Sequence, residues 1–125
     1  MEVRLQIYFL PAFHKTSTVF PENIPFSAYT HLNYAFAFVD PNSFAVAPMS
    51  DTDKDLYSRF TGLKEVNPGL QTWISIGGWS MNDPDQPTHS TFSDLAGSSD
   101  AQSRFFSSLL QFMTTYGFDG VDIDW

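Results

Sequence analysis

The residues FDGVDIDW, at positions 118–125, decide the fold of this chain. Side chains of a β-strand alternate between its two faces, so Asp122 and Asp124 share one face while Val121 and Ile123 share the other. Aspartate is disfavoured in strands, and neighbouring buried carboxylates repel each other and lose their hydration. A purely structural strand would avoid this pattern, which therefore indicates acidic side chains placed for chemistry.

Two other interpretations of the acidic strand remain open. It could be an edge strand whose aspartates lie in water. It could also bind a hard metal cation, although the apolar neighbours of the aspartates add no oxygen ligands. The histidines His14, His31 and His89 show no metal-ligand spacing and are interpreted as surface or structural residues. We therefore predict neither a metal nor a cofactor.

Three more strands are predicted upstream of the acidic one. Residues 31–39 form a nearly continuous apolar run, which is typical of a strand covered on both faces. Residues 70–76 form another strand, and the backbone must turn tightly at Gly77 and Gly78, which follow it. Residues 3–9 alternate apolar with polar side chains and predict a first strand.

Two helices are predicted between these strands. One begins at Ser50 or Asp51, after the apolar run. The other begins at Ser99, which together with Gln102 resembles a capping box, and ends at Gly117. The apolar stripe of this second helix consists of Phe105, Phe106, Leu109, Leu110, Met113 and Tyr116.

The order of these elements predicts parallel strands joined by right-handed helical crossovers, and hence an α/β fold. Four such strands make the N-terminal half of a (β/α)8 TIM barrel, which usually has about 250 residues. Residues 1–125 are therefore expected to be a partial domain, truncated at its C-terminus. Asp122 and Asp124 would point into the barrel, near the rim where such barrels carry out chemistry. The polar segment 81–88 is predicted to be a loop over that site.

The composition argues against several kinds of partner. A net charge of -8 with only six Lys and Arg residues disfavours nucleic acid and anionic membranes. No apolar stretch is long enough to cross a bilayer, and no signal peptide is recognised at the N-terminus. Aromatic residues make up 17% of the chain, which suits stacking on sugar rings. Without cysteine there is no disulfide, thiolate zinc site or cysteine nucleophile.

The acidic strand resembles the fourth-strand signature of glycoside hydrolase family 18 chitinases, Asp-x-x-Asp-x-Asp-x-Glu. Asp119, Asp122 and Asp124 match the three aspartates of that signature. Its glutamate would follow Trp125, so we expect this chain to end just before the catalytic acid. We therefore expect the chain by itself to have no meaningful chitinase activity.

Two upstream segments resemble the same family, most closely its fungal-type members. Residues 75–78, SIGG, match the Ser-x-Gly-Gly signature of the family's third strand, and residues 34–37, YAFA, resemble its second strand. Residues 8–13 resemble the family's first strand only loosely. The similarity covers roughly residues 31–125.

The resemblance implies hydrolysis of chitin or chitooligosaccharides by a substrate-assisted, retaining mechanism. In this family the glutamate protonates the glycosidic oxygen, while the 2-acetamido carbonyl attacks the anomeric carbon and forms an oxazolinium ion. Asp124 would orient the acetamido N–H and stabilise the positive charge, and Asp122 would share a proton with Asp124. The resemblance also suggests an extracellular location.

Further roles follow from the resemblance, each with a plain alternative. Trp79 could be a buried anchor, and Tyr34 and Phe36 could be core residues, because barrel interiors are packed with side chains. Ser75 could simply allow close strand packing. The implied substrate-binding residues are Trp79, Gly78, Tyr34 and Phe36, and the implied supporting residues are Ser75, Gly77 and Asp119, the last counted with the catalytic aspartates.

Two alternative functions remain open. A chitinase-like lectin would bind the same sugar without cleaving it, which occurs in this family when the final glutamate is replaced. A truncated product without function is the other alternative. The intact Asp122 and Asp124 favour an enzyme, because a binding protein has little reason to keep carboxylates that repel each other.

We predict that the isolated 125-residue chain self-associates. A half barrel leaves N–H and C=O groups unpaired on both terminal strands and exposes the inner face of its sheet. Sedimentation of the isolated chain checks this prediction. Oligomers or aggregates are expected, whereas a compact and stable monomer would contradict it.

Overall fold

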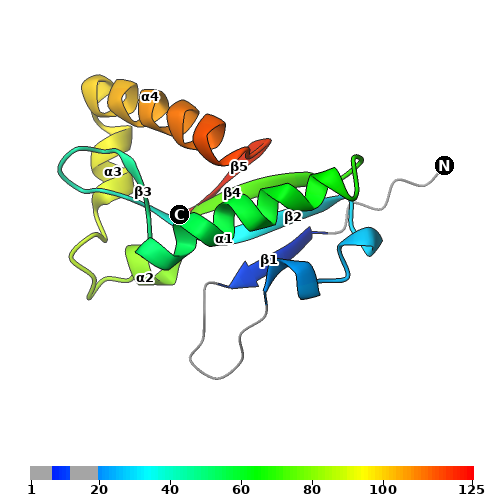
Figure 1. Ribbon diagram of the computed structural model, residues 1–125. Helices are drawn as coiled ribbons and strands as arrows, with labels where there is room; N and C mark the ends of the chain where they lie inside the picture. Colours follow the sequence, from blue (N-terminus) through cyan, green and yellow to red (C-terminus); the bar gives the residue numbers. More distant parts are fainter. Residues whose placement is uncertain (1–6, 12–19) are drawn as a thin grey trace.

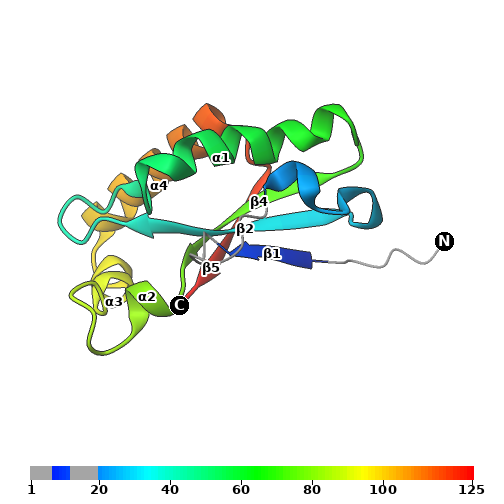
Figure 2. The same ribbon diagram turned by 60° about the horizontal axis from the view of Figure 1, so that its bottom comes forward.

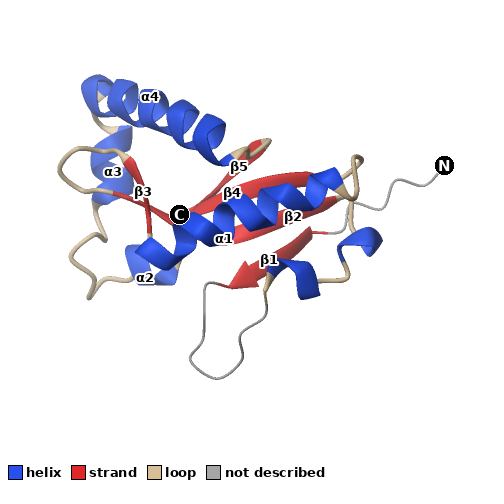
Figure 3. Cartoon of the chain, viewed as in Figure 1, coloured by secondary structure: helices blue, strands red, loops and turns tan. Residues whose placement is uncertain are grey.

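The computed structural model describes residues 7–11 and 20–125 of the chain, with side chains from residue 20 onward. Its sheet has the strand order β1-β2-β4-β5, with all neighbours in this path parallel, and β3 pairs antiparallel with β2 (Figures 1 and 3). The strands are β1 (Ile7–Pro11), β2 (His31–Val39), β3 (Val46–Pro48), β4 (Gln71–Gly77) and β5 (Gly120–Asp124). The predicted α/β fold with parallel strands is confirmed. The predicted first strand lies partly, and His14 entirely, outside the described residues.

α-Helices connect β2 to β4 and β4 to β5, and two of them cover one face of the sheet (Figure 2). Figure 2 shows α1 and α4 side by side on that face. No helix within the described ranges is long and apolar enough to cross a membrane. The helices are α1 (Asp51–Thr61), α2 (Trp79–Asn82), α3 (Thr91–Ala96) and α4 (Ser99–Tyr116), with short 3-10 turns at η1 (Pro21–Asn23), η2 (Phe26–Ala28) and η3 (Gly62–Glu65).

The core lies between the sheet and these two helices. Alternate residues of β2 and β4 point into it, among them Leu32 and Ile74, which are fully buried. Aromatic rings fill the space beside the helices. Tyr57 is central to this cluster and makes edge-on ring contacts with Tyr34 at 4.7 Å and with Phe112 at 5.4 Å.

Tyr34 belongs to this core, which corrects its predicted role in substrate binding. Only 1% of the residue is exposed, and its hydroxyl donates to Oδ1 of the buried Asp53 at 2.7 Å. Burial and the hydrogen bond to Asp53 raise the pKa of Tyr34, so the hydroxyl stays a donor. The reason is strand alternation: Tyr34 pairs with Ile74, and this row of the sheet faces the helices.

The capping of both main helices also differs from the prediction. Ser50 stands at the N-cap of α1, but its hydroxyl donates to Oδ2 of Asp53 at 2.8 Å. Ser98, not Ser99, caps α4 and accepts the N–H of Ala101. Gln102 does not complete a capping box, because its side chain donates to the carbonyl of Ala96.

The buried stripe of α4 is narrower than predicted. Phe105, Leu109 and Phe112 are buried, at positions that share one helix face. Phe106 and Leu110 are 56% and 67% exposed, because they lie one residue further round the helix. Gly117 ends α4 with a φ of 82°, as its position after the apolar stripe predicted.

We predict that Tyr34→Phe destabilises the fold through Asp53. The substitution keeps the ring packing but removes the donor to a buried carboxyl group, which costs about 1 to 3 kcal/mol. Tyr57→Phe is the matched control, because its hydroxyl donates to the neutral carbonyl of Phe36 at 3.1 Å. Urea unfolding of both variants measures the difference. An equal or smaller loss in Tyr34→Phe would contradict the prediction.

Candidate active site

The candidate site lies at the C-terminal ends of β4 and β5. These strands pair in register, with Ser75 opposite Asp122 and Gly77 opposite Asp124. The neighbouring row, which includes Ile76, faces the helices, so alternation places the aspartates on the opposite face of the sheet. The C-terminus of the chain lies beside α2 in both views (Figures 1 and 2).

Ser75 and Asp122 form a hydrogen-bonded pair across the two strands. Ser75 is fully buried and donates its hydroxyl to Oδ2 of Asp122 at 2.9 Å. Asp122 is half-buried, and Asp124, two residues later on the same face, is exposed. An edge strand with its aspartates simply in water does not account for this pair, because one carboxyl group is oriented by a buried donor.

Two glycines bring the strand ends into close contact. Gly77 and Gly78 have φ angles of +116° and +81°, which side chains rarely allow. A Cβ at Gly77 would lie 2.2 Å from the carbonyl oxygen of Asp124, and one at Gly78 would lie 2.9 Å from the ring of Phe36. The N–H of Gly78 also donates to the Asp124 carbonyl at 3.0 Å. Neither glycine can be replaced without separating these groups.

Two of the predicted substrate-binding aromatic residues lie beside the glycines. Trp79 is the first residue of α2 and is 68% exposed, so the alternative of a buried anchor is wrong. Phe36 is half-buried and lies at an irregularity in β2, where the register with β4 shifts between Ala35 and Ala37. The structure thus brings Trp79 and Phe36 to the same edge as Gly78. Their binding of sugar remains a prediction.

Asn82 is a residue of this site that the sequence reasoning missed. Its Nδ2 donates to the carbonyl of Asp124 at 2.7 Å and to that of Gly78 at 3.1 Å. The segment 81–88 was expected to lie over the site, but part of it belongs to the short helix α2. The one available signal was that Asn82 is polar and follows the glycine pair closely.

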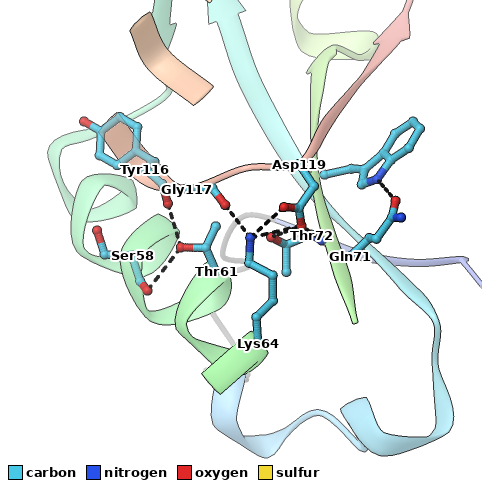
Figure 4. Close-up of polar contacts among 9 residues, drawn as sticks. Ser58, Thr61, Lys64, Gln71, Thr72, Tyr116, Gly117 and Asp119 are labelled. Carbon is cyan, nitrogen blue, oxygen red and sulfur yellow. Dashed lines mark hydrogen bonds and ion pairs between the residues drawn. The ribbon is translucent and has the colours of Figure 1, made fainter. Parts of the chain in front are cut away.

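Asp119 is separated from the other aspartates, which corrects its grouping with the catalytic residues. It lies just before β5 and accepts from Lys64 Nζ at 2.9 Å and from the Thr72 N–H at 2.9 Å (Figure 4). Lys64 also donates to the carbonyl of Gly117, where α4 ends. These contacts fix the start of β5. The site lies at the opposite, C-terminal end of the strand.

The charge of Asp119 is stabilised by these contacts. Partial burial alone would raise its pKa, but the Thr72 N–H and the Lys64 ammonium hold the pKa of Asp119 below its usual value. Its contribution to stability is therefore present above the ordinary aspartate pKa of 3.8 and is lost as the pH falls through the lower folded value.

Trp73 forms the layer below Ser75 and Asp122. It pairs with Gly120 in the row that precedes the Ser75 row, and its indole lies where a Cβ of Gly120 would stand, 2.4 Å away. The same ring meets His31 at 5.9 Å, and its Nε1–H donates to Gln71. Position 120 therefore requires glycine, because the Trp73 ring occupies the space that a side chain would need on the face that carries Asp122.

A family model described as glycosyl hydrolases family 18 matches residues 4–125. The chain belongs to glycoside hydrolase family 18. It is 34% identical over 99 residues to chitinase B of Serratia marcescens, covering 77% of this chain and 20% of that protein. Among solved structures, a mutant family 18 chitinase from Cycas revoluta in complex with (GlcNAc)4 superposes with a TM-score of 0.81 at 32% identity. That match covers 97% of this chain and 33% of the other.

This family 18 chain also resembles a protein named as an agglutinin. The chitinase-like agglutinin of Robinia pseudoacacia superposes with a TM-score of 0.80 at 28% identity, over 95% of this chain and 33% of that one. The chain spans 20% of chitinase B and about a third of the two plant structures. The fold is thus that of one part of a family 18 TIM barrel. The expected likeness to fungal-type members stays a prediction.

We predict that Gly120→Ala disrupts the family 18 site through Trp73. The added methyl group would overlap the indole, and overpacking of this kind costs about 1 to 3 kcal/mol. Trp73→Leu removes the ring, so Gly120→Ala should cost clearly less in the Trp73→Leu background. A double-mutant cycle by urea unfolding measures the coupling. Additive effects would contradict the close contact.

Proposed function

We propose that the protein carrying this family 18 segment hydrolyses chitin or chitooligosaccharides, with retention at the anomeric carbon. The observation that carries the proposal is the oriented Ser75–Asp122 pair, with Asp124 two residues further on the same face. Active sites of TIM barrels lie at the C-terminal ends of the strands, where this pair is found. Support comes also from the Cycas revoluta relative, which was crystallised in complex with (GlcNAc)4.

The proposed mechanism uses the substrate as its own nucleophile. The 2-acetamido carbonyl oxygen attacks the anomeric carbon as the glycosidic bond breaks, and a general acid gives its proton to the leaving oxygen. Water then attacks the anomeric carbon of the oxazolinium ion, opens the ring and returns a proton to the acid. We assign the acid to the residue after Trp125, and residues 1–125 alone should therefore be inactive.

The aspartates would act on the acetamido group. Asp124 would accept its N–H, turn the carbonyl oxygen toward the anomeric carbon, and stabilise the positive charge that develops on the ring. Asp122 would share a proton with Asp124, since two carboxylates this close along one strand repel each other when both are charged. Ser75 would hold Asp122 in the orientation that this exchange requires.

The aromatic residues at the rim would bind the sugar. The exposed indole of Trp79 offers a flat apolar surface on which a pyranose ring can stack. Phe36 would form part of the floor beside it, and Gly78 leaves room for that ring because it has no side chain. These contacts would place the acetamido group over Asp124.

We further propose that residues 1–125 are one part of a catalytic domain and that the isolated segment self-associates. Four large apolar residues that are 44% to 67% exposed support this, because contiguous exposed apolar surface favours association. An extracellular location follows the family resemblance. The four residues are Phe106, Leu110, Ile123 and Trp125.

A sugar-binding protein without catalysis is the second candidate. The agglutinin of Robinia pseudoacacia, which shares this fold, favours it. The hydrogen bond between Ser75 and Asp122 favours the enzyme, because a binding surface has no need of a fixed carboxyl group beside Asp124. An assay of chitooligosaccharide hydrolysis distinguishes the enzyme from the sugar-binding protein.

The test is hydrolysis of chitooligosaccharides by the full-length protein and its Asp124→Asn variant. We expect the variant to bind substrate and to lose about 100-fold to 1,000-fold in kcat, since electrostatic stabilisation of the developing charge is lost. Asp55→Asn is the matched control, because Asp55 is an exposed residue of α1, on the face of the sheet opposite to Asp124.

Two outcomes would contradict the proposal. If the unmodified protein binds chitooligosaccharides without cleaving them, the lectin alternative holds. If Asp124→Asn and Asp55→Asn have the same kcat, Asp124 has no role in the reaction.

A further inference from the structure

The side chain of Asn82 joins α2 to the last residue of β5. Its Nδ2 donates to the carbonyl oxygen of Asp124 at 2.7 Å and to that of Gly78 at 3.1 Å. The Asp124 oxygen also accepts the N–H of Gly78 at 3.0 Å. One carbonyl group at the end of the acidic strand is therefore held by two donors from the segment that follows β4.

The two carbonyl oxygens determine which way the amide of Asn82 points. If the amide were turned over, its own oxygen would face both carbonyls and repel them. In the observed orientation Oδ1 is buried, without a hydrogen-bond partner among the residues described. An unpaired buried acceptor is unfavourable, so the contacts made by Nδ2 determine how this side chain is placed.

The backbone that carries Asn82 is held in place by burial and hydrogen bonds. Met81, the residue before it, is fully buried, and its carbonyl accepts the hydroxyl of Thr88 at 2.8 Å. The backbone N–H groups of Met81 and Asn82 both donate to the carbonyl of Gly78 at 3.1 Å. The amide of Asn82 is thus fixed relative to the end of β4.

A held carbonyl sets the direction of the chain beyond it. The peptide unit is planar, so fixing the carbonyl of Asp124 also fixes the N–H and Cα of Trp125. The next residue along is the one to which the proposed function assigns the general acid. A general acid must lie within hydrogen-bond reach of the oxygen that it protonates, so a small error in this direction is costly.

We propose that Asn82 is a positioning residue, which orients the general acid by holding the backbone carbonyl of Asp124. This inference rests on the proposed function, because it needs an acid beyond Trp125. Asn82 and Trp79 belong to the same short helix, so one unit aims the acid and carries the indole at the rim. Asn82 itself contacts neither substrate nor acid in this scheme.

The test compares Asn82→Asp with the control Asn67→Asp in the full-length protein. Asn82→Asp keeps the shape of the side chain but places oxygen against two carbonyls. Asn67 also donates from its amide to a backbone carbonyl, that of Phe26 at 3.5 Å, and it lies in the turn before β4, far from the site. Asn82→Ala is a second variant, to be used if Asn82→Asp does not fold.

Two substrates separate aiming of the acid from general damage. A chitooligosaccharide has a poor leaving group and needs full protonation, whereas a 4-nitrophenyl glycoside has a good leaving group and needs little. We expect Asn82→Asp to lose about 10-fold to 100-fold in kcat on the oligosaccharide, with KM nearly unchanged. The loss on the nitrophenyl glycoside should be several-fold smaller.

Equal losses on both substrates, or a kcat no lower than that of Asn67→Asp, would overturn the proposal. Hydrogen exchange at the Gly78 amide gives a readout that needs no catalysis, and exchange should be faster in Asn82→Asp. If the unmodified protein binds sugar without cleaving it, the proposed function fails, and the exchange result alone decides whether Asn82 holds the strand end. Unchanged exchange at Gly78 would then overturn that role as well.

Discussion

The close approach of two backbones, at Gly77 of β4 and the carbonyl of Asp124 in β5, is the constraint on which this site depends. There is no room for a Cβ at Gly77, because it would lie 2.2 Å from that carbonyl oxygen. The N–H of Gly78 donates to the same oxygen, so a hydrogen bond joins the strand ends where steric contact already limits them. This contact also sets the distance between β4 and β5 at the Ser75–Asp122 pair, two residues earlier on each strand.

The two ends of the acidic strand are held by interactions of different kinds. At its start, Asp119 is bound by the ammonium of Lys64 and by the backbone of Thr72. At its end, the neutral amide of Asn82 holds the Asp124 carbonyl. A cation close to a carboxyl group favours its charged form, which would oppose the proton sharing that we propose for the aspartates. The neutral amide of Asn82 holds the end nearer the proposed chemistry without favouring the charged form of either aspartate.

Two residues that the motifs assigned to the site lie away from it, for the same physical reason. A motif identifies which residues belong together along the chain but not the depth or the face at which each one lies. Tyr34 is in a segment that resembles the family, yet its row faces the helices and its hydroxyl binds Asp53. Asp119 is part of the acidic signature, yet it lies at the opposite end of the strand from the site. Short elements such as β3 and α3 were missed because three or six residues carry too little periodic signal.

The sequence by itself determined the parallel strands β2, β4 and β5, the shared face of Asp122 and Asp124, and the need for glycine at 77 and 78. These properties depend on side-chain alternation and on backbone conformation, which neighbouring residues encode. Only the tertiary structure decided which residues surround the aspartates. Asn82 and Asp124 are 42 positions apart, and Lys64 and Asp119 are 55 apart. Contacts over such separations depend on the register between strands and on the packing of the connecting helices, which no local pattern specifies.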